Sequence, residues 1–161
     1  QEAAENGYEE AQRYLGEVYI KGHVSKQDYE KSFEWILNSC NDHIEIEYYI
    51  ACLYKFGIGC KQDYIRSLYW FYRCAKNNHP EAQFYLGNSF IKVDQKEALK
   101  WYTISAENGQ ANAQYILGQI YEIGLLGLDK NKSKSLMWYI KSADQGHSLA
   151  KTKIDIQSET N

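Results

Sequence analysis

The chain has 161 residues, of which 44% are hydrophobic and 24% are charged, and its net charge at pH 7 is −3. This length suits one domain, and this composition is typical of a folded protein rather than a disordered one. No stretch of 18 apolar residues occurs, so no membrane-spanning helix is predicted, and without a basic excess we expect no nucleic-acid binding. One proline beside 15 tyrosines and 4 tryptophans favours long helices packed through aromatic rings.

The first seven residues contain neither a Met nor a basic segment followed by an apolar one. They therefore suggest a trimmed or processed product, and they leave the compartment open. We expect a soluble protein that is cytoplasmic, or secreted or periplasmic if a signal peptide has been removed. Fifteen lysines against three arginines hint at an AT-rich genome and favour a bacterial source.

The four cysteines, Cys40, Cys52, Cys60 and Cys74, are enough in number for two disulfides. No pair has Cys-x-x-Cys spacing, and the four histidines are scattered along the chain, so no zinc site is predicted. We expect thiols that fill positions for small residues. If one bond exists, Cys52 and Cys60 are the favoured pair, because they would close a short loop.

Internal repetition is the dominant pattern of the sequence. The four tryptophans, Trp35, Trp70, Trp101 and Trp138, are spaced by 35, 31 and 37 residues. A small residue, followed three positions later by an aromatic one, precedes each of them; these small residues are Gly16, Ala51, Gly87 and Gly118. Most of the variation in spacing falls in one connector. A repeat length of thirty to forty residues, in which only the length of one loop varies, predicts an array of helical repeats.

Each repeat is predicted to contain two helices, because apolar residues recur at helical spacing in both halves. The expected first helices span residues 10–21, 46–56, 81–92 and 112–123, and the expected second helices span 28–41, 63–76, 94–107 and 131–144. The small residue should let the paired helices approach closely, and the tryptophan should fill the space between successive pairs.

Capping residues support these boundaries. Asp28, Asp63 and Asp94 stand where the second helices need an N-cap, and Glu97 completes a pattern resembling a capping box. Pro80 suits the first turn of a helix. Glycines mark the predicted helix ends at Gly22, Gly57, Gly109, Gly124 and Gly146. Phe90 runs directly to Asp94 without a glycine loop, which predicts a shorter connector in the third repeat.

The repeated motif is Ala-Gln-x-x-Leu-Gly-x-x-Tyr, a Gly-x-Gly loop, and then Trp-Tyr-x-x-Ala-Ala-x-x-Gly. The fourth repeat carries it as Ala113-Gln114, Leu117-Gly118, Tyr121, Gly124, Gly127, Trp138-Tyr139, Ala143 and Gly146. This pattern resembles the Sel1-like (Sel-one-like) repeat, a relative of the tetratricopeptide repeat. The resemblance covers essentially the whole chain, because four copies agree in register.

The resemblance implies an all-α fold, a right-handed α/α superhelix or solenoid built from four helix-turn-helix repeats. We expect one repeat domain, residues 1–161, with units at about 8–43, 44–78, 79–109 and 110–146. Partial units are expected at residues 1–7 and 147–161. The last of these either begins a further repeat of a longer array or forms a capping helix at Ala150–Gln157, which the polar residues after it favour.

The resemblance also implies a function, since proteins of this family act mainly as adaptors. They do so in signalling, in protein quality control, in bacterial contact with host cells, and as immunity proteins against antibacterial toxins. We expect a non-enzymatic scaffold that binds another protein, with no catalytic, cofactor-binding or metal-binding residues. The alternatives are an immunity protein, an enzyme that binds or hydrolyses β-lactams, and end-to-end self-association.

Related arrays bind partners on a concave face lined by first helices. Three rows of residues should share that side of the helix. The twelve candidates are Tyr14, Glu17, Lys21, Tyr49, Cys52, Phe56, Tyr85, Asn88, Lys92, Ile116, Gln119 and Ile123. Tyr49 and Tyr85 are the expected central anchors, with packing between helices as the alternative reading of these aromatics. A fourth row, Arg13, Tyr48, Phe84 and Tyr115, is assigned mostly to packing.

Overall fold

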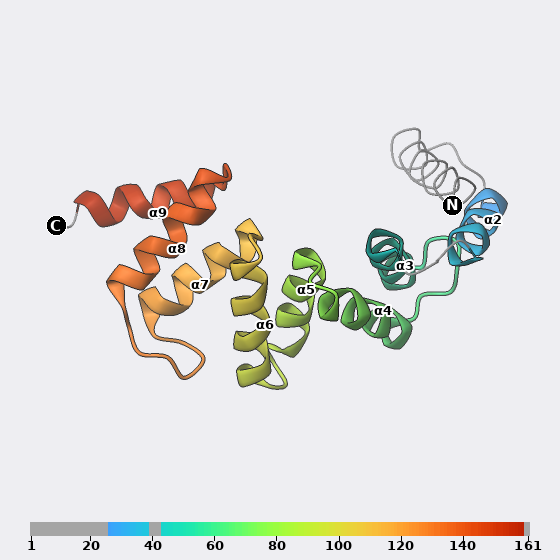
Figure 1. Ribbon diagram of the computed structural model, residues 1–161, viewed down its shortest axis with the longest axis horizontal. Helices are drawn as coiled ribbons and strands as arrows, with labels where there is room; N and C mark the ends of the chain where they lie inside the picture. The colour runs from blue at the N-terminus through green and yellow to red at the C-terminus, as the bar shows by residue number, and fades with distance from the viewer. Residues whose placement is uncertain (1–25, 39–42, 160–161) are drawn as a thin grey trace. The chain divides into compact units, whose positions relative to one another are not determined.

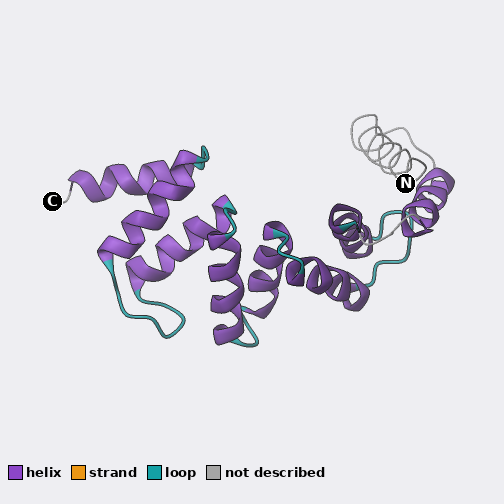
Figure 2. Ribbon diagram, in the orientation of Figure 1, coloured by secondary structure: helices purple, strands orange, loops and turns teal. Residues whose placement is uncertain are grey.

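A computed structural model describes residues 26–38 and 43–159, and its regular structure is entirely helical (Figures 1 and 2). Within these residues there are eight α-helices and no strand, as the repeat pattern predicted. The helices are α2 (Lys26–Asn38), α3 (Ile44–Phe56), α4 (Tyr64–Lys76), α5 (Pro80–Phe90), α6 (Gln95–Glu107), α7 (Ala111–Ile123), α8 (Lys132–Asp144) and α9 (Ser148–Glu159). The predicted helix at residues 10–21 and the predicted ends at residues 39–41 and Gly22 lie outside the described residues.

The molecule divides into two compact units, residues 1–77 and 78–161, and each is described by itself. In the first unit, α3 packs against α4 and also contacts α2. In the second unit, each helix from α5 to α9 packs against the next one along the chain. Whether residues 1–161 behave as one repeat domain stays a prediction.

The capping residues explain where most helices begin. Asp63 and Asp94 are N-caps whose carboxylates accept backbone N–H groups of the first turn, and Asn131 does the same for α8. First helices use a different residue: the Nδ1 atom of His79 accepts from the Ala82 N–H, and the Oε1 atom of Gln110 accepts from the Ala113 N–H. Pro80 is the first residue of α5, as predicted.

Three details of the predicted boundaries are wrong. The described part of α2 spans Lys26–Asn38, so Asp28 lies within the helix rather than at an N-cap. The capping box at Asp94 is half formed, because the Asp94 carboxylate caps the helix but Glu97 does not accept the Asp94 N–H in return. That N–H donates to the Phe90 carbonyl, and Glu97 pairs with Lys100. The helix α5 ends at Phe90, two residues early, because the chain turns at once into the next N-cap.

The connectors between paired helices differ as the glycine pattern predicted. Residues 57–63 link α3 to α4 and residues 124–131 link α7 to α8, whereas only residues 91–94 link α5 to α6. The longer loops begin at Gly57 and Gly124, which end their helices in the left-handed conformation with φ of 67° and 77°. The third repeat has no such residue, and its connector is the shortest.

In each of the three repeats whose two helices are both described, a pair of aromatic rings joins the helices. The ring centroids of Tyr48 and Phe71 are 5.6 Å apart, those of Phe84 and Tyr102 are 6.0 Å apart, and those of Tyr115 and Tyr139 are 5.7 Å apart. The first member of every pair belongs to the row that was assigned to packing. That assignment is therefore confirmed for the three described members of the row.

The small residue of the first helix lies against the second ring of the same repeat. A Cβ atom added to Gly87 would come within 2.6 Å of the Tyr102 ring, and one added to Gly118 within 2.5 Å of the Tyr139 ring. Both tyrosines then reach polar groups with their hydroxyls, at Asn88 Oδ1 (2.9 Å) and Glu122 Oε2 (2.7 Å). The close helix approach predicted from the glycines is confirmed in these two repeats.

In the three repeats whose two helices are both described, a hydrogen bond also joins the end of the second helix to the start of the first helix. The Ser105 hydroxyl donates to the Pro80 carbonyl (2.7 Å), and the Ser142 hydroxyl donates to the Ala111 carbonyl (2.8 Å). In the second repeat the equivalent donor is the buried Cys74 thiol, 3.7 Å from the Ile44 carbonyl. Cys74 therefore occupies a serine position of the repeat.

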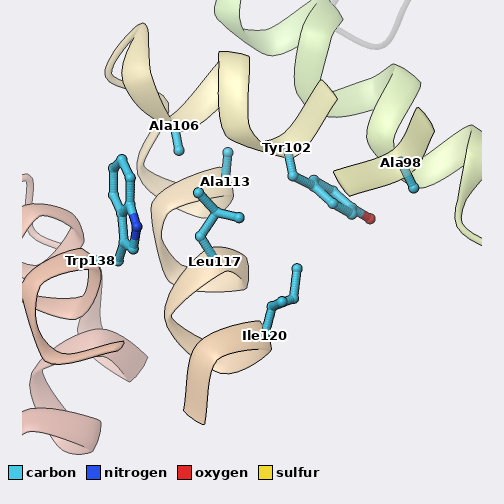
Figure 3. Close-up of a cluster of buried hydrophobic side chains, with 7 residues drawn as sticks. All are labelled: Ala98, Tyr102, Ala106, Ala113, Leu117, Ile120 and Trp138. Carbon is cyan, nitrogen blue, oxygen red and sulfur yellow. The ribbon is translucent and has the colours of Figure 1, made fainter. Parts of the chain in front are cut away.

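Buried clusters hold successive helices together. In the first unit Ile36, Ile46, Ile50, Leu53 and Tyr54 form one such cluster. In the second unit a cluster spans α6, α7 and α8, and Figure 3 shows Tyr102 and Trp138 reaching towards Leu117 from opposite sides. Three of the four tryptophans have described side chains: those of α6 and α8 are buried and that of α4 is half-buried. The side chain of Trp35 lies outside the described residues.

Candidate functional site

The candidate surface in the first unit consists of Tyr49, Cys52 and Phe56 on α3. Tyr49 is half-buried and packs against the isoleucine cluster, with its ring 6.2 Å from that of Tyr48. Phe56 is the last residue of α3 and is 58% exposed, and the Lys55 ammonium lies 4.9 Å from its ring. Phe56 thus offers apolar surface to a partner, while Tyr49 contributes both to packing and to the surface.

The thiol of Cys52 is poorly suited to nucleophilic chemistry. Burial raises its pKa, although Tyr48 and Lys55 act in the opposite direction. Burial also raises the pKa of the Cys60 thiol. Since the thiolate is the reactive form, both groups are less reactive at neutral pH than an ordinary cysteine. Cys52, Cys60 and Cys74 are thiols in this structure, and Cys40 lies outside the described residues.

The candidate surface in the second unit combines residues of α5 and α7. Tyr85 and Ile116 are half-buried, and Ile116 packs against the buried cluster. Asn88 is exposed, but its Oδ1 atom already accepts the Tyr102 hydroxyl. Gln119 donates from Nε2 to the hydroxyl of Tyr115 at 3.1 Å. These residues are apolar side chains and amides, and the amides of Asn88 and Gln119 are hydrogen-bonded to tyrosine hydroxyls.

Two candidates stand at the ends of first helices. Ile123 is the last residue of α7 and is 51% exposed. Lys92 was expected on the helix, but α5 ends at Phe90 and Lys92 lies in the connector, so the third row is broken in this repeat. Tyr14, Glu17 and Lys21 lie outside the described residues. The role of all twelve candidates in binding stays a prediction.

The sequence did not indicate a polar network between α7, α8 and α9. Glu122 Oε2 accepts the Tyr139 hydroxyl and forms an ion pair of 2.9 Å with Lys153 Nζ. Burial alone would raise the pKa of Glu122, but hydrogen bonds from Lys153, Tyr139 and Gln157 together hold it below its ordinary value. Burial, and to a smaller extent the hydrogen bond to Glu122, raises the pKa of Tyr139. The network fixes α9 to the fourth repeat.

A buried ion pair replaces an amide network in the second repeat. At the same position of each first helix stand Glu47, Gln83 and Gln114. Gln83 accepts from Asn108, and Gln114 accepts from Gln145, whereas the buried Glu47 carboxylate lies 2.6 Å from Arg73. Comparing the repeats position by position would have identified this exchange from the sequence.

Within the part of the chain that the structure describes, no group of three or more His, Cys, Asp and Glu side chains could hold a metal ion. Among the same residues, no helix combines the length and the apolar character needed to cross a bilayer.

The model of the Sel1 repeat family matches four segments, residues 9–41, 45–79, 80–110 and 111–147. The chain belongs to the Sel1 repeat family. The matched segments agree with the predicted units to within two residues at each boundary. Sel1 repeat proteins are generally non-enzymatic scaffolds that bind other proteins, and the chain shares their all-α solenoid fold.

Solved Sel1 repeat structures resemble this one. A protective antigen of uropathogenic Escherichia coli is 33% identical over 87% of this chain and 31% of its own, with a TM-score of 0.70. A Sel1 repeat protein from Oxalobacter formigenes is 26% identical over 87% of this chain and 59% of its own, with a TM-score of 0.73. The chain thus spans less than two thirds of either relative.

A third structure shares the fold alone. An immunity protein from Pseudomonas aeruginosa is 21% identical over 93% of this chain and 69% of its own, with a TM-score of 0.51. These three relatives come from bacteria, in keeping with the source that the composition favoured. No curated protein matches the chain significantly.

Proposed function

We propose that this Sel1 repeat protein is a scaffold that binds a segment of another protein on the surface formed by its first helices. In the second unit this surface consists of Tyr85, Asn88, Ile116, Gln119 and Ile123. The supporting observation is the kind of side chain that these first helices carry. Tyr85 and Ile116 are half-buried, Ile123 is exposed, and the amides of Asn88 and Gln119 are held by hydrogen bonds to tyrosine hydroxyls. Such a mixture is common at protein interfaces.

A photo-crosslinking side chain placed at Gln119 tests this proposal in cells that express the protein. We expect it to capture a protein that the same group at Lys96, an exposed residue of α6, does not capture. The captured partner is then purified, and its affinity is measured against the Ile123→Glu and Tyr85→Ala variants. We expect each substitution to weaken binding at least tenfold, because both remove apolar contact area.

Unchanged affinity in both variants would show that the binding face lies elsewhere. Tyr85 is half-buried, so its alanine variant is compared with the parent well below its melting temperature. Ile123 is exposed at a helix end, and we expect its substitution to leave the melting temperature nearly unchanged.

The immunity alternative predicts that the captured partner is a secreted toxin and that the complex abolishes its activity. Its support is the shared fold of the immunity protein from Pseudomonas aeruginosa. The enzymatic alternative predicts turnover of a β-lactam that a point substitution removes. The thiols of Cys52 and Cys60 are weak candidates for the nucleophile of such a reaction, because burial raises their pKa values.

A further inference from the structure

The helix α4 exposes a larger apolar face than α6 or α8, the other second helices whose side chains are all described; α8 exposes only Met137 and Ile140 among its large apolar side chains, and α6 exposes none. Ile65 is 84% exposed, Tyr64 is 63% exposed and Tyr69 is 58% exposed, and Leu68 and Tyr72 extend the same face. These five residues recur at spacings of one, three and four, which places them on one side of an α-helix. We call them the α4 face.

The register of the repeat indicates that three residues of the α4 face occupy solvent positions. Counted from the N-caps, Tyr64, Ile65 and Tyr69 correspond to Gln95, Lys96 and Lys100 of α6. Those three polar residues are exposed although α6 packs against both α5 and α7. The positions are therefore solvent positions in a stacked repeat, and α4 differs from α6 in the type of residue that fills them.

The surroundings of the α4 face are basic, although the whole chain has a net charge of −3. Residues 44–77 contain three acids, Glu45, Glu47 and Asp63, and five bases, Lys55, Lys61, Arg66, Arg73 and Lys76, which gives this segment a net charge of +2. Arg73 is paired with Glu47 and Arg66 with Asp63, and the three lysines supply the excess of positive charge. The side chain of Arg66 is 66% exposed and Lys76 is exposed. Arg73 lies 5.0 Å from the Trp70 ring, and Lys76 lies 5.8 Å from the Tyr72 ring.

We propose that the α4 face binds an acidic segment of a partner protein. Apolar side chains of that segment would pack on Ile65 and the tyrosines, and its carboxylates would pair with the lysines around the face, such as Lys61 and Lys76. Tyrosine, tryptophan and arginine are the residue types that contribute most to interface affinity. The charge of the surroundings selects an acidic partner over a basic one. This surface belongs to a second helix, so it goes beyond the scaffold function proposed for the first helices.

The probe is a fluorescein-labelled peptide of 14 residues in which glutamate alternates with leucine. Two control peptides carry glutamine or lysine in place of glutamate. Fluorescence anisotropy should show that the glutamate peptide binds at least tenfold more tightly than the glutamine peptide. The lysine peptide should not bind, and the affinity of the glutamate peptide should fall as salt rises.

The decisive variant is Ile65→Lys with Tyr69→Lys, which gives α4 the residues that α6 carries at the same positions. We expect at least a tenfold loss of affinity for the glutamate peptide, although the variant adds two positive charges. The melting temperature should stay within a few degrees, because both side chains are exposed. The matched control, Lys96→Ala with Lys100→Ala on α6, should bind the peptide like the parent.

Equal binding of the parent and the Ile65→Lys, Tyr69→Lys variant would overturn the proposal, as would equal binding of the three peptides or no binding at all. Sedimentation equilibrium of the parent without peptide is the remaining arm. Self-association that the double variant abolishes would show that a second copy of the chain covers the α4 face, and it would also overturn the proposal. None of these outcomes depends on crosslinking at Gln119.

Discussion

Gly118 lets the ring of Tyr139 lie directly against the backbone of α7. The substitution Gly118→Ala places a Cβ atom 2.5 Å from that ring, and the hydroxyl bond to Glu122 keeps the ring from moving away. We expect the variant to lose about 1–3 kcal/mol of unfolding free energy, even though alanine is the better helix former. Urea denaturation measures this loss.

The second repeat suggests a compensating change, since it carries Ala51 in the glycine position and Phe71 in the tyrosine position. Phenylalanine at position 139 has no bond to Glu122 and can shift. The double variant Gly118→Ala, Tyr139→Phe should therefore lose less stability than the sum of the two single variants. Strict additivity would contradict this explanation of the Gly–Tyr pair.

Cys74 is buried and occupies the position of Ser105 and Ser142. We expect Cys74→Ser to keep the stability of the parent within about 1 kcal/mol, because a hydroxyl can donate to the Ile44 carbonyl with better geometry than a thiol. Cys74→Ala should cost about 1–2 kcal/mol, since it removes the donor and leaves a small void. Thermal unfolding compares the two, and equal losses would show that the hydrogen bond is unimportant.

At the scale of single helices, α9 depends on a carboxylate. The hydrogen bonds from Lys153, Tyr139 and Gln157 lower the pKa of Glu122 in the folded state. Stability from a carboxylate with a lowered pKa is fully present above the pKa of the unfolded chain and is lost as pH falls through the folded pKa. Glu122→Gln should therefore cost about 1 kcal/mol at pH 7 and progressively less below about pH 4.

Urea denaturation at several pH values measures this difference, with Asp129→Asn in the exposed loop between α7 and α8 as the control. A loss that stays constant between pH 7 and pH 3 would contradict the role given to the charged form. Amide hydrogen exchange should also show faster exchange in α9 of the Glu122→Gln variant, because this network fixes that helix.

The helices were predictable from the sequence because their boundaries depend on local chemistry. Asp63, Pro80 and Gly124 act within one turn of the residues that they cap, so the pattern located α3, α4, α7 and α8 to within two residues. The end of α5 was missed because no glycine marks it. The N-cap predicted at Asp28 was wrong, because Asp28 lies within α2.

The candidate site was less predictable, since burial and side-chain bonds depend on tertiary packing. Spacing placed Tyr49 and Tyr85 on one side of their helices, but it could not show that Tyr49 packs against the isoleucine cluster. It also could not show that Asn88 and Gln119 are bonded to tyrosine hydroxyls. The α4 face and the exchange of glutamine for Glu47 were visible in the aligned repeats, because both depart from the chain's own pattern.

At the scale of the molecule, each of the two compact units contains a buried cluster. Trp138→Ala removes a large ring from the cluster of α6, α7 and α8, and we expect it to cost that unit about 3–5 kcal/mol. In a repeat array such a loss acts on neighbouring repeats only. Hydrogen exchange read by mass spectrometry should accelerate in α7 and α8 and stay unchanged in α3 and α4. Uniform acceleration would show that the chain unfolds as one cooperative body.

The bonds that join the two helices of a repeat connect residues that are close along the chain. Ser105 bonds to a residue 25 positions away, Cys74 to one 30 positions away and Ser142 to one 31 positions away. Contacts between residues so close along the chain require only short loops to close during folding. The entropic part of the folding barrier is therefore low. Rapid folding that starts in any repeat and spreads to the next follows from this arrangement.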